Sequence, residues 1–393
     1  MTGISPAGSV GRAPQADARA APAVVIVGGG NIVSGREIMM LALGRGLRAA
    51  GYRIVFITSL WSGQGDFLAR LRADGFEFYR VRLGFISITL SLKPIWWTLD
   101  QLRYWPALVW GYLGAIKKAA PVAVIHTNWH HALLLLPFLN RRRDIYWSHE
   151  IIPASRHYGV VFRAIARRVR KMVCTSNAVA RALEAHGIDP AKIAVVHNAL
   201  LLDGVSQGPD TSFPLRLGLI GLIGEWKGHG DALEALALLR DSAAKVVLKI
   251  FGKGDPDYIA VLHEKATSLG IQDRLEWCGF VSDQKEIFQA IDVCLMPSRL
   301  AESFGLSALE AGMCGRPVIC TDMGGLPEIV INGQTGLVVP PSRPDLLASA
   351  IETFIKRPDL IVAMGTAGRT RVEKEFSYSR FVDRFVDVIE AVG

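Results

Sequence analysis

The sequence predicts an α/β protein in which two domains, each built on an open sheet, face each other across a cleft. The chain has 393 residues, half of them hydrophobic, which is enough for two separate cores. Short β-branched apolar runs alternate with stretches of helical periodicity, as in parallel sheets covered by helices. A segment rich in Gly, Ser, Asp and Pro interrupts the alternation near the middle. We therefore expect two Rossmann-like domains joined by a linker.

The first domain is predicted over residues 24–205. It follows a tail, residues 1–23, that is dominated by Ala, Gly, Pro and Ser and that we expect to be disordered. The run AVVIVGG is apolar, β-branched and ended by glycines, as a buried parallel strand is, and the helical stretch REIMMLALGRGLRAA follows it. Further strands are predicted at YRIVFITS, VAVIHTN, DIYWSHE and KMVCTS.

Residues 206–214 are the predicted linker, and the second domain follows over residues 215–376. Its predicted strands are LRLGLIG, KVVLKIFG, RLEWCGF, VCLMPS, PVICTD and GLVVP. Residues 377–393 place Phe381, Phe385, Val388 and Ile389 on one helical face, which predicts an amphipathic closing helix. Ligands of doubly wound sheets bind beyond the carboxyl ends of the strands, so we expect the active site in the cleft.

The composition favours a cytoplasmic protein. The first stretch lacks the apolar core of a secretory signal, and polar residues and a proline interrupt the longest uncharged stretch too often for a membrane span. Five cysteines without CxxC spacing indicate neither a disulfide framework nor a zinc site. Residues 1–205 carry 25 Lys and Arg against 11 Asp and Glu, a net +14, and the rest carries 19 against 25, a net −6. The two halves should therefore face different partners.

Two glutamates within residues 298–340, Glu302 and Glu310, form the strongest motif. A helix is predicted to begin near Gly305, and the amides of its first turn can bind an anion such as a diphosphate. Helical side chains lean toward the N-terminus, so Glu310 can point back to the same end. Because carboxylates repel phosphate, their useful partners are hydroxyls, which indicates a sugar and a ribose. The alternative is that both glutamates are ordinary solvated residues.

This segment resembles the donor-binding region of the family 4 retaining glycosyltransferases with the GT-B fold, whose motif is a Glu, seven residues and a second Glu. The resemblance is strongest over residues 215–376. It implies that Glu302 binds hydroxyls of the donor sugar and that Glu310 binds the ribose of the nucleotide. It also implies that amides near Phe304, Gly305 and Leu306 approach the sugar and the diphosphate.

The resemblance extends to GLIGEWKGH, which begins at Gly221. The family usually has a basic residue where Leu222 stands and a lysine where Lys227 stands, both facing the diphosphate, and this chain keeps only Lys227. Arg299 is a candidate substitute for the missing cation. The alternative for Lys227 is a surface lysine at a helix start.

Gly252 in FGKGDPDYI matches a glycine loop that the family uses without metal. Asp255 and Asp257 in this loop could hold a metal, but a lone DxD is a weak signal. We expect no metal and no cofactor, with the nucleotide-diphosphate sugar as substrate. The segment DMGGLPE, which ends at Glu328, resembles a further donor-side loop.

In the first half, Gly35 matches a glycine turn of the family that opens the first helix, where the backbone can approach donor phosphate or acceptor. His149 ends the run DIYWSHE, at the carboxyl end of a predicted strand. Family members commonly carry a histidine there, beside the donor sugar. The candidate catalytic residues are thus His149, Lys227 and Glu302, and the alternative for His149 is a structural histidine. Gly28 and its neighbours make a poor dinucleotide fingerprint.

The stretch from Lys93 to Lys118 combines basic flanks with four tryptophans, at positions 96, 97, 105 and 110, and a second basic stretch spans residues 163–171. Aromatic rings beside basic residues suit a membrane interface or a lipid-linked acceptor, and the alternative is a core helix pair with a solvated face. A nucleic-acid motif is absent from the sequence.

The implied activity is transfer of a sugar to an acceptor hydroxyl with retention of configuration. The expected partners are a nucleotide-sugar donor, a saccharide or lipid-linked acceptor in cell-surface polysaccharide synthesis, and an anionic membrane surface on the cytoplasmic side. Two alternatives stay open: a nucleotide-sugar epimerase of the same architecture, and a non-catalytic nucleotide-sugar-binding subunit, which the loss of a basic residue at Leu222 suggests.

Overall fold

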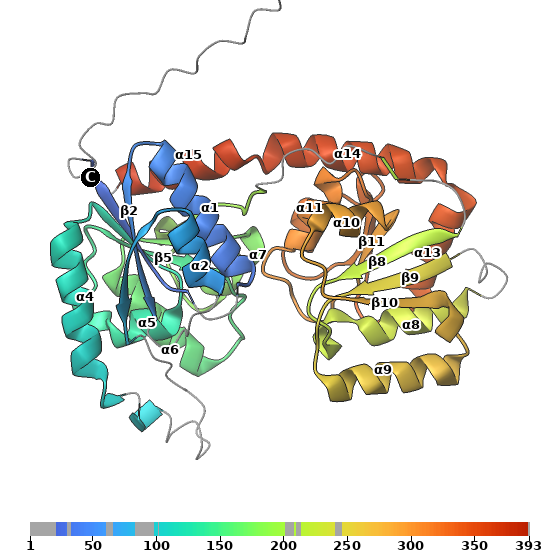
Figure 1. Cartoon of the computed structure of the whole chain (residues 1–393), viewed down its shortest axis with the longest axis horizontal. Coiled ribbons are helices and arrows are strands. Elements are labelled where there is room, and N and C mark those ends of the chain that lie inside the picture. Colours follow the sequence, from blue (N-terminus) through green and yellow to red (C-terminus); the bar gives the residue numbers. More distant parts are fainter. Residues whose placement is uncertain are drawn as a thin grey trace, which may run out of the picture.

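The computed structural model describes residues 21–29, 33–59, 66–82, 98–100, 102–200, 208–209, 214–239 and 246–391. These residues form two lobes that lie side by side, each a parallel sheet with helices on its faces (Figure 1). Within the described ranges, the first sheet has seven strands in the order β3-β2-β1-β4-β5-β6-β7, and the second has six in the order β10-β9-β8-β11-β12-β13. The predicted α/β architecture with two Rossmann-like sheets is confirmed.

The first lobe is built on strands that are apolar enough to be covered on both faces, and two buried clusters fill those faces. Its strands are β1 (Ala23–Val27), β2 (Arg53–Ser59), β3 (Glu77–Val81), β4 (Ala123–His126), β5 (Asp144–Ser148), β6 (Lys171–Cys174) and β7 (Ile193–Val195). Its helices are α1 (Gly35–Ala49), α2 (Asp66–Ala73), α4 (Trp105–Ala119), α5 (Trp129–Leu134), α6 (Arg156–Arg168) and α7 (Asn177–Ala185), with 3₁₀ turns at Leu136–Phe138 and Pro190–Lys192.

The second lobe repeats this plan with two further clusters. Its strands are β8 (Leu215–Ile220), β9 (Val246–Phe251), β10 (Leu275–Gly279), β11 (Val293–Met296), β12 (Val318–Thr321) and β13 (Gly336–Val339). Its helices are α8 (His229–Leu238), α9 (Pro256–Leu269), α10 (Gln284–Gln289), α11 (Leu306–Met313), α12 (Leu326–Ile329), α13 (Pro344–Lys356) and α14 (Asp359–Glu375), with 3₁₀ turns at Glu225–Lys227 and Gln272–Arg274.

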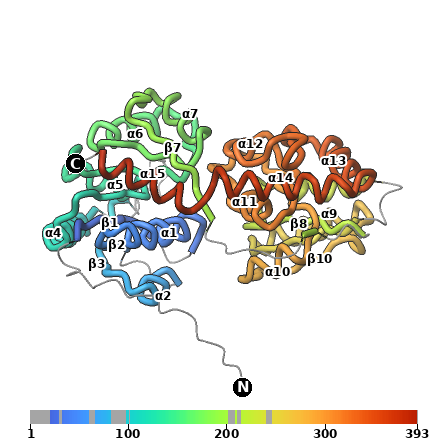
Figure 2. The backbone as a smooth tube through the Cα atoms, turned by 90° about the horizontal axis from the view of Figure 1, so that it is seen from above, coloured from blue at the N-terminus to red at the C-terminus, as the bar shows by residue number. Residues whose placement is uncertain are grey.

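The last helix, α15 (Tyr378–Glu390), returns to the first lobe (Figures 1 and 2). Its apolar face, including Phe381 and Phe385, is buried in the cluster that holds β1 and α1. A Cβ added at Gly46 of α1 would lie 2.2 Å from Val382 Cγ2, so glycine permits the close approach of the two helices. The Tyr378 hydroxyl donates a hydrogen bond to the Ala42 carbonyl over 2.7 Å. The chain therefore crosses between the lobes twice.

Two strands were not predicted, and several predicted features lie outside the described residues. Strands β3 and β7 were missed, because β3 is only partly buried and β7 has three residues. Residues 1–20 of the tail, Trp96, Trp97 and most of the linker lie outside the described residues. The five cysteines are free. The helices within the described ranges are each too short or too polar to cross a bilayer.

Candidate active site

The carboxyl ends of strands from both sheets meet at a cavity of about 460 Å³ between the lobes. Segments that follow β1, β5 and β7 reach it from the first lobe, and segments that follow β8 and β11 reach it from the second. Its lining comprises Ser34, Gly35, Arg36, His149, Glu150, Asn198, Lys227, Met296, Glu302, Ser303, Phe304, Gly305, Leu306 and Ser307. Of the predicted site residues, the structure brings together Gly35, His149, Lys227, Glu302, Phe304, Gly305 and Leu306.

Lys227 and Glu302 form an ion pair in this cavity. Lys227 Nζ lies 2.5 Å from Glu302 Oε1, and Ser298 Oγ donates to the same oxygen over 2.7 Å. Lys227 ends a 3₁₀ turn, and the next residue, Gly228, has a φ of +73°. A Cβ there would lie 1.9 Å from the carbonyl oxygen of Pro297, so glycine is required for the turn to pack beside the end of β11.

The backbone of Glu302 is held by the glycines of the DMGGLPE segment. Gly324 forms a bridge to Glu302 with a φ of +64°, and a Cβ at Gly324 would lie 2.1 Å from the Glu302 carbonyl oxygen. The amide of Gly325 donates to that oxygen over 2.8 Å. These two glycines therefore position a carboxylate rather than form a free turn.

Helix α11 begins at Leu306, directly after Gly305, as the sequence predicts. Gly305 has a φ of +104°, and a Cβ there would lie 2.5 Å from Leu326 Cδ2. The side chain of Phe304 is buried in the hydrophobic cluster behind the loop, so its backbone is what the cavity can use. The amides of Leu306 and Ser307 belong to the first turn, which has no intrahelical acceptor for them, and this end of the helix favours an anion.

The N-terminus of α1 lies opposite, in the first lobe. Glu37 and Ser34 form a capping box, in which the Ser34 amide donates to Glu37 Oε2 over 3.1 Å and the Ser34 hydroxyl also donates to it. Arg36 Nε donates to Glu37 Oε1 over 3.1 Å. A Cβ at Gly35 would lie 2.8 Å from Leu306 Cδ1, so the two helices meet closely here. The resemblance placed Arg36 in the same glycine turn as Gly35 but gave it no role in the site.

His149 lies directly after β5 with its ring 4.1 Å from that of Trp147, measured between centroids. Its Nε2 is buried without a hydrogen-bond partner among the described residues. Burial, followed by the charge of Arg36, holds the pKa of His149 well below its usual value, so the ring is neutral at physiological pH. Asn198, which the sequence analysis missed, is 5% exposed, and its Oδ1 is likewise buried without a partner. Both groups can hydrogen-bond a ligand.

Glu310 and Arg299 are described but do not line this cavity. Glu310 lies on α11 and accepts a hydrogen bond from Gln284, and burial raises its pKa to about 7. Arg299 binds Asp231 through two bonds, Nε to Oδ2 at 2.9 Å and Nη2 to Oδ1 at 2.6 Å. This pairing leaves Arg299 engaged away from the cavity rather than free to replace a cation at Leu222.

Gly221 and Gly252 also lie outside the cavity lining and meet each other at the ends of β8 and β9. Gly252 has a φ of +153°, and a Cβ there would lie 1.8 Å from the Gly221 carbonyl oxygen. These two glycines therefore allow a close backbone contact beside the cleft.

Two other polar side chains, one at the end of β4 and one before α9, have structural partners. His126 forms a buried pair with Asp144, Nε2 to Oδ1, at 2.7 Å. Asp255 caps α9 by accepting a hydrogen bond from the Asp257 amide over 3.1 Å. Within the part of the chain that the structure describes, no group of three His, Cys, Asp or Glu side chains could hold a metal ion.

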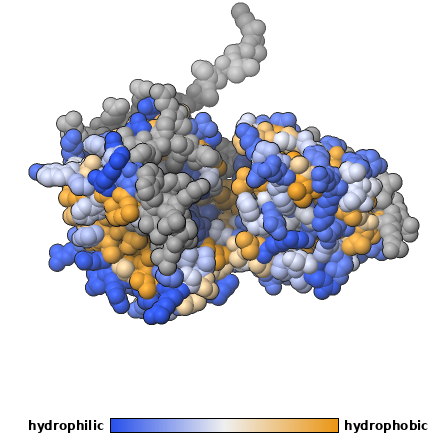
Figure 3. Space-filling model, turned by 90° about the horizontal axis from the view of Figure 1, so that it is seen from below, coloured by the Kyte–Doolittle hydropathy of each residue, from blue (hydrophilic) through white to orange (hydrophobic). Residues whose placement is uncertain are grey.

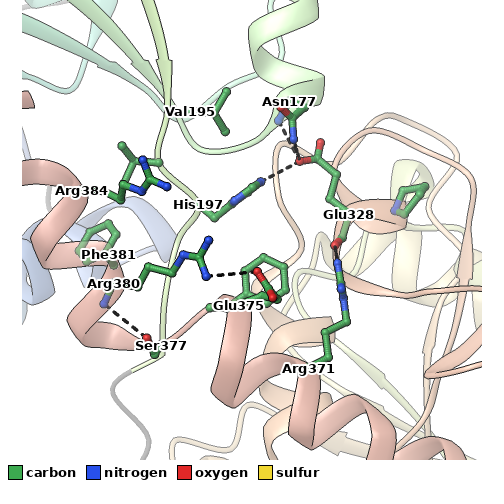
Figure 4. A pocket seen from close by; sticks show the side chains of 13 residues that line it. Asn177, Val195, His197, Glu328, Arg371, Glu375, Ser377, Arg380, Phe381 and Arg384 are labelled. Carbon is green, nitrogen blue, oxygen red and sulfur yellow. Dashed lines mark hydrogen bonds and ion pairs between the residues drawn. The ribbon is translucent and has the colours of Figure 1, made fainter. Parts of the chain in front are cut away.

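A second pocket, of about 400 Å³, lies where the lobes join, and Glu328 of α12 reaches across it (Figure 4). Glu328 accepts hydrogen bonds from the backbone and side-chain nitrogens of Asn177 at 2.9 and 2.7 Å, from the Ala178 amide at 2.8 Å and from His197 Nε2 at 2.9 Å. Burial alone would raise the pKa of Glu328, but these hydrogen bonds outweigh it and lower the pKa to about 2. We call this set of bonds the Glu328 clasp.

Comparison with solved structures identifies the class of fold. The Anabaena protein HepE in complex with UDP-glucose matches with a TM-score of 0.76 at 18% identity, over 94% of this chain and 99% of that chain. The lipopolysaccharide outer core galactosyltransferase WaaB, in its apo form, matches with a TM-score of 0.73 at 17% identity, over 94% and 99%. The two-lobed architecture is therefore that of the GT-B glycosyltransferases.

Sequence comparison identifies the family. The model for glycosyl transferases group 1 matches residues 215–371, and the model for a glycosyl transferase 4-like domain matches residues 34–199. D-inositol 3-phosphate glycosyltransferases from Gordonia bronchialis and Rhodococcus erythropolis are 30% and 29% identical over 318 and 312 residues, which is 76% and 75% of this chain. A relative of the same name from Geodermatophilus obscurus is 32% identical over 249 residues, 59% of this chain. The chain spans 67%, 68% and 54% of these relatives. It belongs to the group 1 glycosyltransferase family.

Proposed function

We propose that this chain is a retaining glycosyltransferase that moves a sugar from a nucleotide-diphosphate donor to an acceptor hydroxyl. The observation that carries the proposal is the Lys227–Glu302 pair beside the first turn of α11, in a cavity built by both lobes. The pair offers a cation to a diphosphate and a carboxylate to sugar hydroxyls, and the helix end adds amides. The crystals of HepE with UDP and with UDP-glucose support a nucleotide-sugar donor here.

The charge-separating step of such a transfer is departure of the nucleoside diphosphate. In this proposal, Lys227 and the first turn of α11 stabilise the negative charge that develops on the diphosphate. Lys227 is paired with Glu302, so donor binding would exchange this contact for lysine–phosphate and carboxylate–hydroxyl contacts. Neutral His149 on the opposite wall offers a hydrogen bond to the sugar. The proposed transfer takes place on the front face of the donor sugar, where the acceptor attacks from the side that the diphosphate leaves. The leaving phosphate takes the proton of the acceptor hydroxyl, and no side chain needs to act as nucleophile.

The proposal includes independence from divalent metals, because Lys227 and the helix amides fill the electrostatic role that a metal would have. We expect transfer to be nearly unchanged in EDTA. The measurement is the initial rate of product formation with chelator, and then with added magnesium or manganese. Loss of activity in EDTA that magnesium or manganese restores would contradict metal independence. Asp255 and Asp257 would then be the candidate metal ligands.

The proposed acceptor is a lipid-linked saccharide in cell-surface polysaccharide synthesis, which would wait at the cytoplasmic membrane face. The support is the net +14 of residues 1–205 and the exposed apolar side chains on or beside α4, which are Leu99, Leu102, Trp110 and Leu113. Hydrophobic and hydrophilic areas lie next to each other on the lobe of the first sheet (Figure 3). The names of the curated relatives favour a second candidate acceptor, an inositol phosphate.

A thermal-shift screen against UDP, GDP and ADP sugars tests the donor, followed by transfer assays with each candidate acceptor. We expect stabilisation by one donor class and, by NMR of the product, the same anomeric configuration as in the donor. Inverted product would overturn retention. Interconversion of the donor sugar without any acceptor would indicate an epimerase, and donor binding without hydrolysis or transfer would indicate a binding subunit.

A further inference from the structure

The charged side chains that line the cavity balance one another. Arg36 and Lys227 are basic, whereas Glu150 and Glu302 are acidic. Lys227, the cation from the second lobe, already lies 2.5 Å from Glu302. A nucleoside diphosphate carries more than one negative charge, so a second cation would add to the stabilisation that Lys227 and the helix end supply. Arg36 is the cation that the first lobe contributes to this cavity.

The guanidinium of Arg36 is held from one side. Its Nε and Nη2 lie 3.1 and 3.0 Å from Glu37 Oε1. Glu37 is 1% exposed and also accepts a hydrogen bond from the Ser34 amide, so its carboxylate is held in one position. In the described part of the chain, the acid near Nη1 is Glu150, whose Oε1 is 3.9 Å away, beyond hydrogen-bond distance. The edge of the Arg36 guanidinium that carries Nη1 therefore keeps N–H donors that can bind an oxyanion.

The position of Arg36 follows from the contact between the lobes. Gly35, the residue before it, meets Leu306 so closely that a Cβ would lie 2.8 Å from Leu306 Cδ1. Arg36 therefore stands on the first turn of α1 next to the first turn of α11, where an anion is favoured from both sides. Asn198, whose buried Oδ1 has no partner among the described residues, lines the same cavity and indicates a site that a polar ligand completes.

We propose that Arg36 binds the β-phosphate of the nucleotide-diphosphate donor and so supplies, from the first lobe, the second cation for the leaving group. This inference rests on the proposed function and names a further residue of the same site. Because Lys227 belongs to the second lobe, the diphosphate would lie between cations from both lobes. Donor binding would then favour the arrangement in which Gly35 and Leu306 touch.

Calorimetric titration tests this proposal with UDP, GDP and ADP, each compared with its monophosphate. Arg36→Gln removes the charge and keeps a hydrogen-bonding group. The affinity of this variant for the diphosphate that the wild type binds should be roughly ten- to a hundredfold lower. The matching monophosphate lacks the β-phosphate and should bind nearly as before. Arg36→Lys should restore part of the loss. Arg45→Gln on the same helix, where Arg45 pairs with Asp74, is the matched control and should bind as the wild type does.

An equal loss of diphosphate and monophosphate binding in Arg36→Gln would overturn the proposal, because it would indicate that Arg36 only supports the capping box. Unchanged diphosphate affinity in that variant, with a wild type that binds the diphosphate, would overturn this inference and leave the proposed function intact. A wild type that binds none of the three diphosphates and transfers no sugar would overturn both.

Discussion

Glu302 and Glu310 are eight positions apart and have different surroundings, so their removal should have different effects. Glu302 lies in the cavity with Lys227, whereas Glu310 lies on α11 beside Gln284. Glu310→Ala should leave a ribose hydroxyl unpaired and weaken nucleotide binding by about 1–3 kcal/mol. Glu302→Ala should mainly lower kcat. Calorimetry and steady-state kinetics measure the two effects, with exposed Glu286→Ala as control. Normal transfer by both variants would show that the assignment is wrong.

The carboxyl of Glu310 also predicts a pH dependence. Its pKa of about 7 lies above its ordinary value of 4.5 because burial disfavours the charged form. The expected role of Glu310 is to accept hydrogen bonds from ribose hydroxyls in its ionised form, so nucleotide affinity should rise as the pH rises through about 7. The pH dependence of folding stability has the opposite sign, because the raised pKa means that the folded state favours the protonated carboxyl. The stability that Glu310 contributes is therefore lost as the pH rises from about 4.5 to about 7.

Calorimetry between pH 5.5 and 8.5, a range set about the pKa of Glu310, measures this dependence, and buffers of different ionisation enthalpy report the proton released on binding. Glu310→Gln keeps the shape of the side chain and cannot ionise. The pH-dependent part of the affinity should therefore disappear in that variant. A slope that stays the same would assign the titration to another group, such as the phosphate of the nucleotide.

Single residues of the site were predictable where the signal is local. The spacing of Glu302 and Glu310 and the helix start at Gly305 can be seen within a dozen positions, and the structure has the helix there. Arg36 and Asn198 could not be assigned to the site, because they become cavity residues only when the two lobes meet. The position of Arg299 was also hidden, since its partner Asp231 is far away in sequence.

At the scale of elements, the Glu328 clasp ties the beginning of α7 to the second lobe. Glu328 lies on α12 and accepts from the first two amides of α7, where a carboxylate is stabilised by the helix dipole. In the preceding residue, Ser176 Oγ donates to the carbonyl of Ser303, which lines the active-site cavity, over 2.6 Å. Residues 176–178 therefore contact both Glu328 of α12 and the loop that carries Glu302.

Glu328→Gln should weaken this contact between the lobes. The hydrogen bonds of the clasp favour the ionised carboxylate and lower the pKa of Glu328 from 4.5 to about 2, so they stabilise the folded chain at neutral pH. Because the pKa is depressed, this stability is present above pH 4.5 and is lost as the pH falls toward about 2. Thermal unfolding should thus show a lower midpoint for the variant at pH 7 and a shrinking difference below pH 4.5.

A second carboxylate in the same pocket supplies the control. Glu375 pairs with Arg380 at 3.2 Å, and both side chains are partly exposed, so Glu375→Gln should change the midpoint little. Equal midpoints for Glu328→Gln and the wild type across this pH range would show that the clasp does not stabilise the folded chain.

Most strands that the sequence predicted are buried along much of their length, with β10 as an exception. β1 reads AVVIV and is buried along its whole length, whereas β3 reads EFYRV, is mostly exposed or half-buried and lies at the edge of the sheet. The apolar face of α15 was also predictable from its period. Its docking site was not, because the fit depends on Gly46 of α1, more than three hundred positions earlier.

At the scale of the whole molecule, charge and exposed apolar groups gather on the first lobe. Trp110 of α4 is 79% exposed, while Trp105 donates its indole N–H to the Leu134 carbonyl over 2.9 Å and contacts Phe138. Phe138 in turn lines a surface pocket with Arg141, Arg143, Arg167 and Arg168. The exposed helix α4 therefore adjoins a cluster of arginines, which is the combination that a membrane interface favours.

The last prediction is that this lobe docks on anionic membranes. Anionic lipid contributes roughly 1 kcal/mol per adjoining Lys or Arg, so a few arginines should give reversible attachment that salt weakens. Trp110 at the headgroup level should add an apolar part that salt does not remove. Vesicle co-sedimentation at low and high salt measures both parts. Arg167→Ala/Arg168→Ala should remove most of the salt-sensitive part, and Trp110→Ala should remove the remainder.

Matched variants on the second lobe separate docking from general surface effects. Arg343→Ala/Arg357→Ala changes the net charge equally, and Phe280→Ala removes an exposed ring, so both should sediment with vesicles as the wild type does. Trp105 is unsuitable as a probe, since its replacement would also disturb the packing against Leu134 and Phe138. Equal recovery of the wild type with and without anionic vesicles at low salt would contradict docking. A soluble acceptor, such as an inositol phosphate, would then be favoured over a lipid-linked one, because a lipid-linked acceptor requires the enzyme to reach the membrane surface.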